Sequence, residues 1–143
     1  MGTTPTEVTE ISAGGHPVVL GRDALRSLDR RSGQEEFSTA FILGDENTLR
    51  HCLPELLAHV PRLRDARTMA IPPGERSKDI AVCTDIWRHL AAEAADREAV
   101  LICLGGGVVT DLGGFVAATY KRGGRCVLLP SWLLGLLDVA CGG

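Results

Sequence analysis

An apolar run that ends in three glycines constrains the fold of this chain more than any other feature. Ala99–Leu104 is apolar throughout, and Gly105, Gly106 and Gly107 follow it directly. A short, continuous apolar run is typical of a strand buried on both faces of a parallel sheet. The glycines end the strand sharply, and a helix is expected from Val108. The sequence therefore predicts a strand, a tight turn and a helix in immediate succession.

The alternation of strand and helix extends over most of the chain. Short connections between alternating strands and helices predict an α/β fold, a Rossmann-like, open and mainly parallel sheet with flanking helices. In such a sheet a ligand binds at the carboxyl ends of the strands. Before this unit, the residues on either side of Gly14-Gly15 predict a small hairpin of Glu7–Ile11 and His16–Leu20.

The individual elements follow from the periodicity of the apolar residues. Ser77 is the expected N-cap of a helix that carries Ile80, Cys83, Ile86, Trp87 and Leu90 on one face. The other expected helices are 23–31, one opened by Gly44-Asp45 that continues towards Val60, one from Val108, and one from Pro130-Ser131 through Ala140; the expected strands are 39–43, 68–71, 99–104 and a buried strand at 126–129.

Composition excludes several classes of protein. The chain has 143 residues, which fits one domain, and 45% hydrophobic with 23% charged residues is a globular composition. A net charge of -3 argues against nucleic acid as a partner. The longest apolar stretch, 126–140, is interrupted by Pro130 and Asp138 and is too short to cross a membrane. The polar amino terminus is unlike a signal peptide, so a cytoplasmic location is expected.

The five cysteines and four histidines show no metal-ligand spacing. No CxxC pair occurs, so neither a zinc site nor a disulfide framework is indicated, and most of the cysteines are expected to be buried thiols. We therefore predict no metal site in these 143 residues.

The glycine turn is the strongest candidate for a binding site. A β-carbon there would keep a phosphate away from the backbone N–H groups, and the dipole of the following helix favours negative charge. Gly105, Gly106, Gly107 and Val108 are therefore candidates to bind a diphosphate, with a ligand-free tight turn as the alternative. Asp111 lies one helical turn further on, where an unpaired carboxylate would suit a ribose or nicotinamide.

Other polar residues follow the predicted strand ends. Asp45 is placed either to bind the hydroxyls of an adenosine ribose or to cap a helix. In the segment PPGERSK, Glu75 and Lys78 either contact another ribose edge or form a solvated salt bridge. Lys121 and Arg122 lie in a Gly-rich turn, either within reach of a phosphate or as plain surface cations. Asp138 interrupts an otherwise apolar helix, which favours a functional role.

Three segments, PPGERSK, LGGGVVTDLGGFVAATYKRG and LPSWLLGLLDVACGG, resemble in this order and spacing the amino-terminal domain of 3-dehydroquinate synthases. The related glycerol and iron-dependent alcohol dehydrogenases share only the GGG and aspartate core, whereas AATYKRG is characteristic of the synthases and related sugar-phosphate cyclases. The resemblance extends from Asp45-Glu46-Asn47 onward, and more loosely before it.

The resemblance implies an NAD-dependent lyase of the shikimate pathway of aromatic amino acid biosynthesis. Such an enzyme converts a seven-carbon sugar phosphate to 3-dehydroquinate and phosphate, and NAD is recycled rather than consumed. A divalent metal, zinc or cobalt, polarises the hydroxyl under oxidation. The partners implied are this small sugar-phosphate substrate and, in the full-length enzyme, a second copy in a homodimer.

The resemblance also assigns roles to residues. Asp45 and Asn47 match the adenosine-side contacts, Glu75 and Lys78 the acid and lysine at the ribose, and Asp111 the aspartate beside the cofactor. Gly105–Val108 match the diphosphate turn. The resemblance further matches Arg122 to the arginine that reaches the substrate phosphate of a neighbouring subunit, and Asp138 to the aspartate near nicotinamide and substrate.

The chain departs from the family pattern in two places. The family usually has Pro-Thr-Thr-Leu-Leu, with both threonines at NAD, where this chain has Pro130, Ser131 and Trp132 before its leucines. Ser131 keeps a hydroxyl, but the indole of Trp132 replaces a small polar contact. The family also continues into a catalytic lysine and a helical metal-binding domain, which are absent from residues 1–143.

We therefore expect residues 1–143 to form an NAD-binding domain that is inactive by itself. Two alternatives remain: a stand-alone or degenerate nucleotide-binding module, and an NAD-dependent polyol dehydrogenase of the related superfamily.

Overall fold

A computed structural model describes residues 9–13, 16–20, 29–30 and 37–131. Its centre is a sheet of four parallel strands, in the order β4-β3-β5-β6. The predicted parallel α/β fold is therefore confirmed. The strands are β3 (Ala40–Asp45), β4 (Arg67–Ile71), β5 (Val100–Gly105) and β6 (Arg125–Pro130).

The predicted hairpin is also present. Strands β1 (Thr9–Ala13) and β2 (His16–Leu20) pair antiparallel, in a two-stranded sheet of their own.

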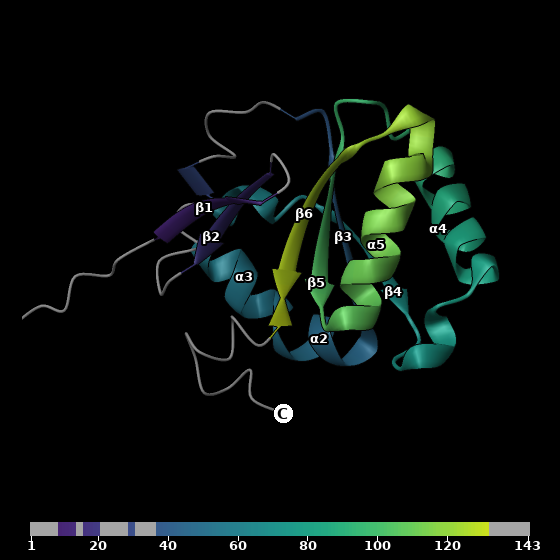
Figure 1. Ribbon diagram of the computed structural model, residues 1–143, viewed down its shortest axis with the longest axis horizontal. Coiled ribbons are helices and arrows are strands. Elements are labelled where there is room, and N and C mark those ends of the chain that lie inside the picture. Colours follow the sequence, from purple (N-terminus) through teal and green to yellow (C-terminus); the bar gives the residue numbers. More distant parts are fainter. Residues whose placement is uncertain (1–8, 14–15, 21–28, 31–36, 132–143) are drawn as a thin grey trace, which may run out of the picture.

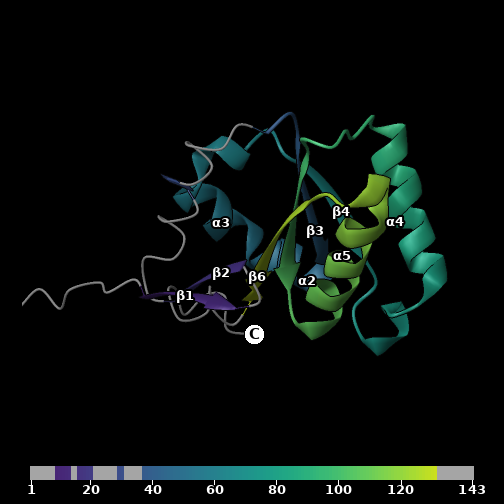
Figure 2. The same ribbon diagram turned by 45° about the horizontal axis from the view of Figure 1, so that its top comes forward.

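Helices cover both faces of the parallel sheet. Figures 1 and 2 show α4 (Ile80–Ala92) and α5 (Gly107–Thr119) on one side and α3 (Leu53–His59) on the other. Helix α2 (Glu46–His51) lies between β3 and α3 along the chain. Three short 3-10 turns complete the described part: η1 (Pro61–Leu63), η2 (Glu75–Ser77) and η3 (Tyr120–Arg122).

The alternation of side chains along each strand divides the core into two layers. On one face, residues such as Phe41, Leu43 and Leu101 pack with α4 and α5; on the other, Ile42 and Ile102 pack with residues of α2 and α3. All six residues of β5 are buried, as expected for a strand with neighbours on both edges and helices over both faces.

Several local expectations were wrong. The predicted helix from Asp45 towards Val60 is divided at Cys52 into α2 and α3. Pro54 supplies the reason, because it has no N–H to donate and so interrupts the ladder of helical hydrogen bonds. Ile80 was expected on the buried face of α4, but it is 64% exposed at the first position of that helix.

The expectation that the last strand is buried was also wrong. Strand β6 is an edge strand of the described four-stranded sheet. Cys126 is exposed, and Leu128 is 50% exposed. Both side chains lie on the face that α5 covers, but at its margin. The other described cysteines, Cys52, Cys83 and Cys103, are buried as expected.

Two predicted helices cannot be compared with the structure. Most of the helix 23–31 and the part of the last helix after Ser131 lie outside the described residues.

Close contact between α5 and β5 depends on a glycine. A β-carbon at Gly113 would lie 2.1 Å from the Sγ atom of Cys103, so the sulfur fills the space that a side chain at position 113 would need. At the neighbouring Gly114, a β-carbon would meet no atom of the described residues within 4 Å. The two adjacent glycines of α5 therefore have different structural roles.

We predict that Gly113→Ala destabilises the protein by about 1–3 kcal/mol, the usual cost of overpacking a filled core. Gly114→Ala is the matched control. It should stabilise the protein by up to about 1 kcal/mol, because alanine is the better helix former. Urea unfolding of the two variants measures both effects, and equal stabilities would contradict the packing described here.

Candidate functional site

The carboxyl ends of the four parallel strands lie at one edge of the sheet. The register pairs Asp45 of β3 with Ile71 of β4, and Gly105 of β5 with Pro130 of β6. The segments that follow these strands carry most of the candidate residues. The structure therefore brings together, at this edge, residues that are far apart in the sequence: Asp45 and Asn47, Glu75 and Lys78, Gly105–Val108 and Asp111, and Ser131.

The chain builds the sheet outward from β3 in two opposite directions. From β3 the chain passes through α2 and α3 to β4 on one side, whereas β5 lies on the other side of β3 and continues outward to β6. The helices of these two halves cover opposite faces, as right-handed crossovers require. Between β3 and β5, the helices that follow the two strands diverge, and this is the place where open α/β sheets bind ligands.

The glycines of the turn after β5 have two different roles. Gly105 is buried, and a β-carbon there would lie 2.7 Å from the β-carbon of Val109, so this glycine lets α5 approach its own strand. Gly106 and Gly107 are exposed, and added β-carbons would meet no described atom within 4 Å. The space in front of these two residues is open to a ligand.

The first turn of α5 differs from those of α2 and α4 in how its backbone N–H groups are satisfied. Asp45 caps α2 and Asp79 caps α4, each through a side-chain carboxylate. The N-cap of α5 is Gly106, and no side chain of the described residues caps this helix. The first N–H groups of a helix have no intrahelical partner. This turn therefore presents donors and the positive end of the helix dipole to the open space.

Of the two interpretations of Asp45, helix capping is confirmed. Its Oδ1 accepts a hydrogen bond of 2.8 Å from the N–H of Thr48, and its own N–H donates to Thr48 Oγ1 over 3.0 Å. This does not test the proposed ribose contact. For α4 the expected cap, Ser77, was wrong: Ser77 is buried in η2, where its hydroxyl donates to the carbonyl of Pro72, and the cap is Asp79.

Sequence reasoning missed Thr48. Its hydroxyl lies 2.9 Å from the carbonyl oxygen of Leu104, the residue before the glycine turn. This bond joins the start of α2 to the end of β5, across the boundary between the two halves of the sheet. The threonine three residues after a capping aspartate was a usable signal for the local part of this arrangement, but the contact with Leu104 joins residues 56 positions apart.

Asp111 was expected to be unpaired, and this was wrong. Its Oδ2 lies 2.9 Å from Nζ of Lys78, which also lies 3.7 Å from Oε2 of Glu75. The salt-bridge interpretation of Glu75 and Lys78 is therefore confirmed, and it extends to a third residue on another element. Through Lys78, the loop after β4 is joined to the first turns of α5.

The two carboxylates also affect the titration of the lysine. The hydrogen bond and charge of Asp111, followed by the charge of Glu75, raise the pKa of Lys78 above its ordinary value. Lys78 is therefore fully protonated at neutral pH. A positive charge is thus held at the open side of the site, beside carboxylates that are 65% and 79% exposed for Asp111 and Glu75.

Other candidate residues lie elsewhere. Arg122 and Lys121 belong to η3, at the opposite end of α5 from the glycine turn, and the side chain of Arg122 lies outside what the structure describes. A helix of 13 residues is about 20 Å long, so Arg122 does not join the carboxyl edge of its own sheet. Trp132 and Asp138 lie outside the described residues.

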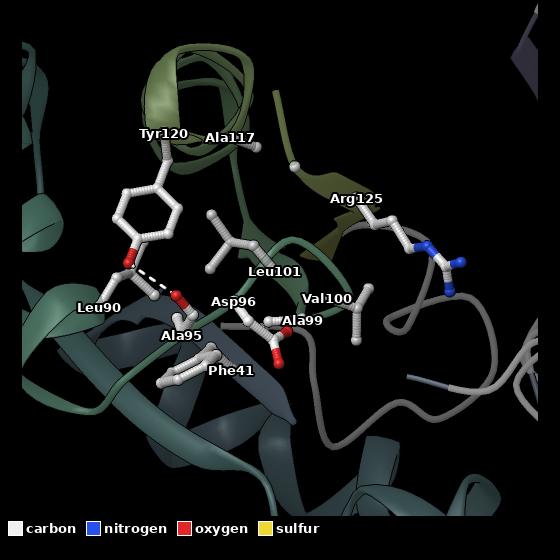
Figure 3. A pocket seen from close by; sticks show the side chains of 11 residues that line it. Phe41, Leu90, Ala95, Asp96, Ala99, Val100, Leu101, Ala117, Tyr120 and Arg125 are labelled. Atoms are coloured by element: carbon white, nitrogen blue, oxygen red, sulfur yellow. Dashed lines mark hydrogen bonds between the residues drawn. The ribbon is translucent and has the colours of Figure 1, made fainter. Parts of the chain in front are cut away.

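A small hollow lies at the other edge of the sheet, where the strands begin. Figure 3 shows Leu101 and Tyr120 among its lining residues, with the Tyr120 hydroxyl directed at the carbonyl of Ala95, 2.9 Å away. Burial raises the pKa of Tyr120. This bond fixes the start of η3 to the loop before β5. The hollow is mainly apolar and remote from the glycine turn, so we assign it a structural role.

Within the described residues, no helix is both long and apolar enough to span a bilayer. Among the same residues, no cluster of three or more histidine, cysteine or acidic side chains is placed to hold a metal ion.

Comparison with known proteins identifies the family. The model of the family described as 3-dehydroquinate synthase N-terminal matches residues 68–143, more than half of the chain. The chain belongs to the 3-dehydroquinate synthase family. A 3-dehydroquinate synthase of Thermobifida fusca is 38% identical over 95% of the chain, which covers 38% of that relative. The chain spans little more than a third of the length of the curated relatives it matches.

Solved structures agree with the fold. A 2-deoxy-scyllo-inosose synthase complexed with carbaglucose-6-phosphate, NAD+ and Co2+ is similar with a TM-score of 0.75 and 18% identity, over 87% of this chain and 35% of that one. A 2-epi-5-epi-valiolone synthase of Streptomyces hygroscopicus with NAD+ and Zn2+ bound has a TM-score of 0.53 and 26% identity, over 70% of this chain and 28% of that one. The first similarity supports the fold alone.

We predict that Thr48→Val, which keeps the shape of the side chain, destabilises the protein by about 1–3 kcal/mol, because the buried carbonyl of Leu104 and the N–H of Asp45 each lose a hydrogen bond. Thr84→Val in α4 is the control, since the Thr84 hydroxyl bonds only within its own helix, to Ile80, and it should cost less than about 1 kcal/mol. Thermal unfolding compares the two variants. Equal losses would show that the bonds of the Thr48 hydroxyl to Leu104 and Asp45 contribute nothing specific.

Proposed function

We propose that this chain is the NAD-binding half of a 3-dehydroquinate synthase, the enzyme that converts a heptulosonate phosphate to 3-dehydroquinate and phosphate. The observation that carries the proposal is the grouping of Asp45, Lys78, Asp111 and the uncapped glycine turn at one edge of the sheet. Family membership and the NAD+ described for the valiolone synthase support it.

The glycine turn fits a diphosphate. The N–H groups of the first turn of α5 would donate to its oxygens, and the open space at Gly106 and Gly107 would let the diphosphate reach the backbone. Gly105 contributes indirectly, because it allows Val109 to pack against the end of β5. The chemistry that NAD would supply at this site is reversible hydride transfer with a ring carbon of the substrate, so the cofactor would not be consumed.

The charged residues around the turn fit the two riboses. Asp45 uses Oδ1 for the helix cap, and a carboxylate has acceptor sites for a ribose hydroxyl besides this bond. Asp111 and Glu75 are exposed on either side of Lys78. In this proposal Lys78 orients the two carboxylates, while Asn47, Ser131 and Trp132 complete the contacts with the cofactor.

We place Arg122 in the site of a neighbouring subunit. The length of α5 separates η3 from the glycine turn of the same chain, so a role for Arg122 at the substrate phosphate requires a second copy. This agrees with a homodimeric enzyme. Asp138, beyond the described residues, is proposed to lie near nicotinamide and substrate.

The zinc or cobalt ion that the family resemblance implies is not assigned to the described residues. The described residues hold no cluster of ligands for zinc or cobalt, so no step through a metal is assigned to them. We propose that residues 1–143 are one domain, that the metal is bound by a further domain of the family, and that the protein acts in the cytoplasm.

Binding of NAD+ is the direct test. The backbone of Gly106, with φ -79° and ψ -166°, is accessible to any residue, so Gly106→Val should fold normally. Its side chain would occupy the approach of the diphosphate and should abolish binding measured by isothermal titration calorimetry. The control, Gly114→Ala, changes a glycine of the same helix away from the turn and should bind NAD+ as the parent does. Unchanged affinity in Gly106→Val would contradict the assigned turn.

Phosphate release tests whether residues 1–143 are active without a further domain. We predict that residues 1–143 alone release no phosphate from the heptulosonate phosphate with NAD+ and zinc or cobalt present, whereas a chain extended by its downstream coding sequence does. Metal-dependent release by the 143-residue chain would contradict this. Net accumulation of NADH without phosphate release by the extended chain would instead favour a polyol dehydrogenase.

A further inference from the structure

Two thiols on neighbouring strands lie outside the site described above. The Sγ atoms of Cys103 on β5 and Cys126 on β6 are 3.7 Å apart. Cys126 is opposite Leu101 in the register, so the two cysteines are diagonal neighbours on the same face of the sheet. Their proximity is a product of parallel pairing between segments 23 residues apart.

The two thiols have different environments. Cys103 is completely buried beneath α5, in the notch left by Gly113, whereas Cys126 is exposed. The hydrogen bond from the Cys103 thiol lowers the pKa of Cys126, while the same interaction and burial raise that of Cys103. Accessibility and thiolate character both make Cys126 the sulfur that a reagent in solution reaches first.

We propose that Cys103 and Cys126 form a redox-active dithiol, in which a peroxide oxidises Cys126 and Cys103 then closes a reversible disulfide between β5 and β6. The other buried cysteines are placed differently: Cys52 belongs to the core layer on the opposite face of the sheet, and Cys83 is on α4. The proposal does not depend on the proposed function.

The chemistry takes place in two steps. The Cys126 thiolate attacks one oxygen of hydrogen peroxide, the O–O bond breaks, and hydroxide leaves and is protonated to water, so that Cys126 becomes a sulfenic acid. The sulfur of Cys103 then attacks that of Cys126. An S–S bond forms, the S–O bond breaks, and the hydroxide leaves with the proton of Cys103 as a second water. The two sulfurs together lose two electrons, which reduce the peroxide.

Closure requires a small movement of β6. The sulfurs must approach to about 2.05 Å. Parallel strands about 4.8 Å apart and an offset of two residues, about 6.6 Å, place the two α-carbons about 8 Å apart, beyond the roughly 4.4–6.8 Å that a disulfide usually spans, so the backbone has to move. Strand β6 is at the edge of the described sheet, so it can slide along β5 without displacing another of its strands. A disulfide closed under this constraint is readily reduced, which suits a reversible modification.

Hydrogen peroxide is the probe for the test. The chain is treated with it under native conditions, unreacted thiols are alkylated, and the peptides are mapped by mass spectrometry. We expect a Cys103–Cys126 disulfide, two hydrogens lighter than the dithiol, which a thiol reductant reverses. Sulfinic acid at Cys126 with no such disulfide, or no reaction of Cys126, would overturn the proposal.

Three variants test which cysteines form the disulfide. Cys126→Ser should abolish the disulfide, and Cys103→Ser should let Cys126 proceed to the sulfinic acid, since no thiol remains to intercept the sulfenic acid. Cys141→Ser, which changes a cysteine outside the described residues, should leave the disulfide unchanged. A disulfide of Cys126 with Cys141 in the parent chain, rather than with Cys103, would overturn the proposal. Thermal unfolding of the reduced variants verifies that each is folded before oxidation.

Discussion

The close packing of α5 against the buried strand β5 is the constraint on which the rest of the structure depends. Two glycines permit it, because Gly105 admits Val109 and Gly113 admits the sulfur of Cys103. Strand β5 has neighbours on both edges and helices over both faces. This packing fixes the start of α5 at the carboxyl edge of the sheet, and therefore fixes the direction in which its free N–H groups point.

The candidate site follows from that placement. Helices α2 and α4 begin at the same edge, but aspartates cap them, so α5 is the helix of the three whose first turn presents its donors to a ligand. Thr48 and Lys78 then join the loops around this turn to one another, the first through Leu104 and the second through Asp111. Side-chain contacts thus hold the segments on both sides of the open glycine turn in place.

Most of the fold, and the sheet edge at which the candidate residues gather, could be predicted, because apolar periodicity and glycine position are local signals. The errors arose where two local signals competed. Leucine periodicity suggested one helix from Asp45 to Val60, but the missing N–H of Pro54 divides it. Ser77 and Asp79 are both good caps, and the choice was decided by the carbonyl of Pro72, which takes the Ser77 hydroxyl. Capping and ribose binding at Asp45 could not be separated, because one carboxylate can serve both.

By itself, the sequence determined the strands, most of the helices and the resemblance to the synthases, since these depend on residues close together in the chain. The edge at which the candidate residues gather followed from the parallel sheet that the alternation of strands and helices predicts. Only the tertiary structure decided that Asp111 is paired with Lys78, that β6 is exposed along one face, and that Cys103 lies beside Cys126. These contacts depend on how far one packed element is displaced from another. That displacement is set by the volume of the side chains between them, which no local pattern records.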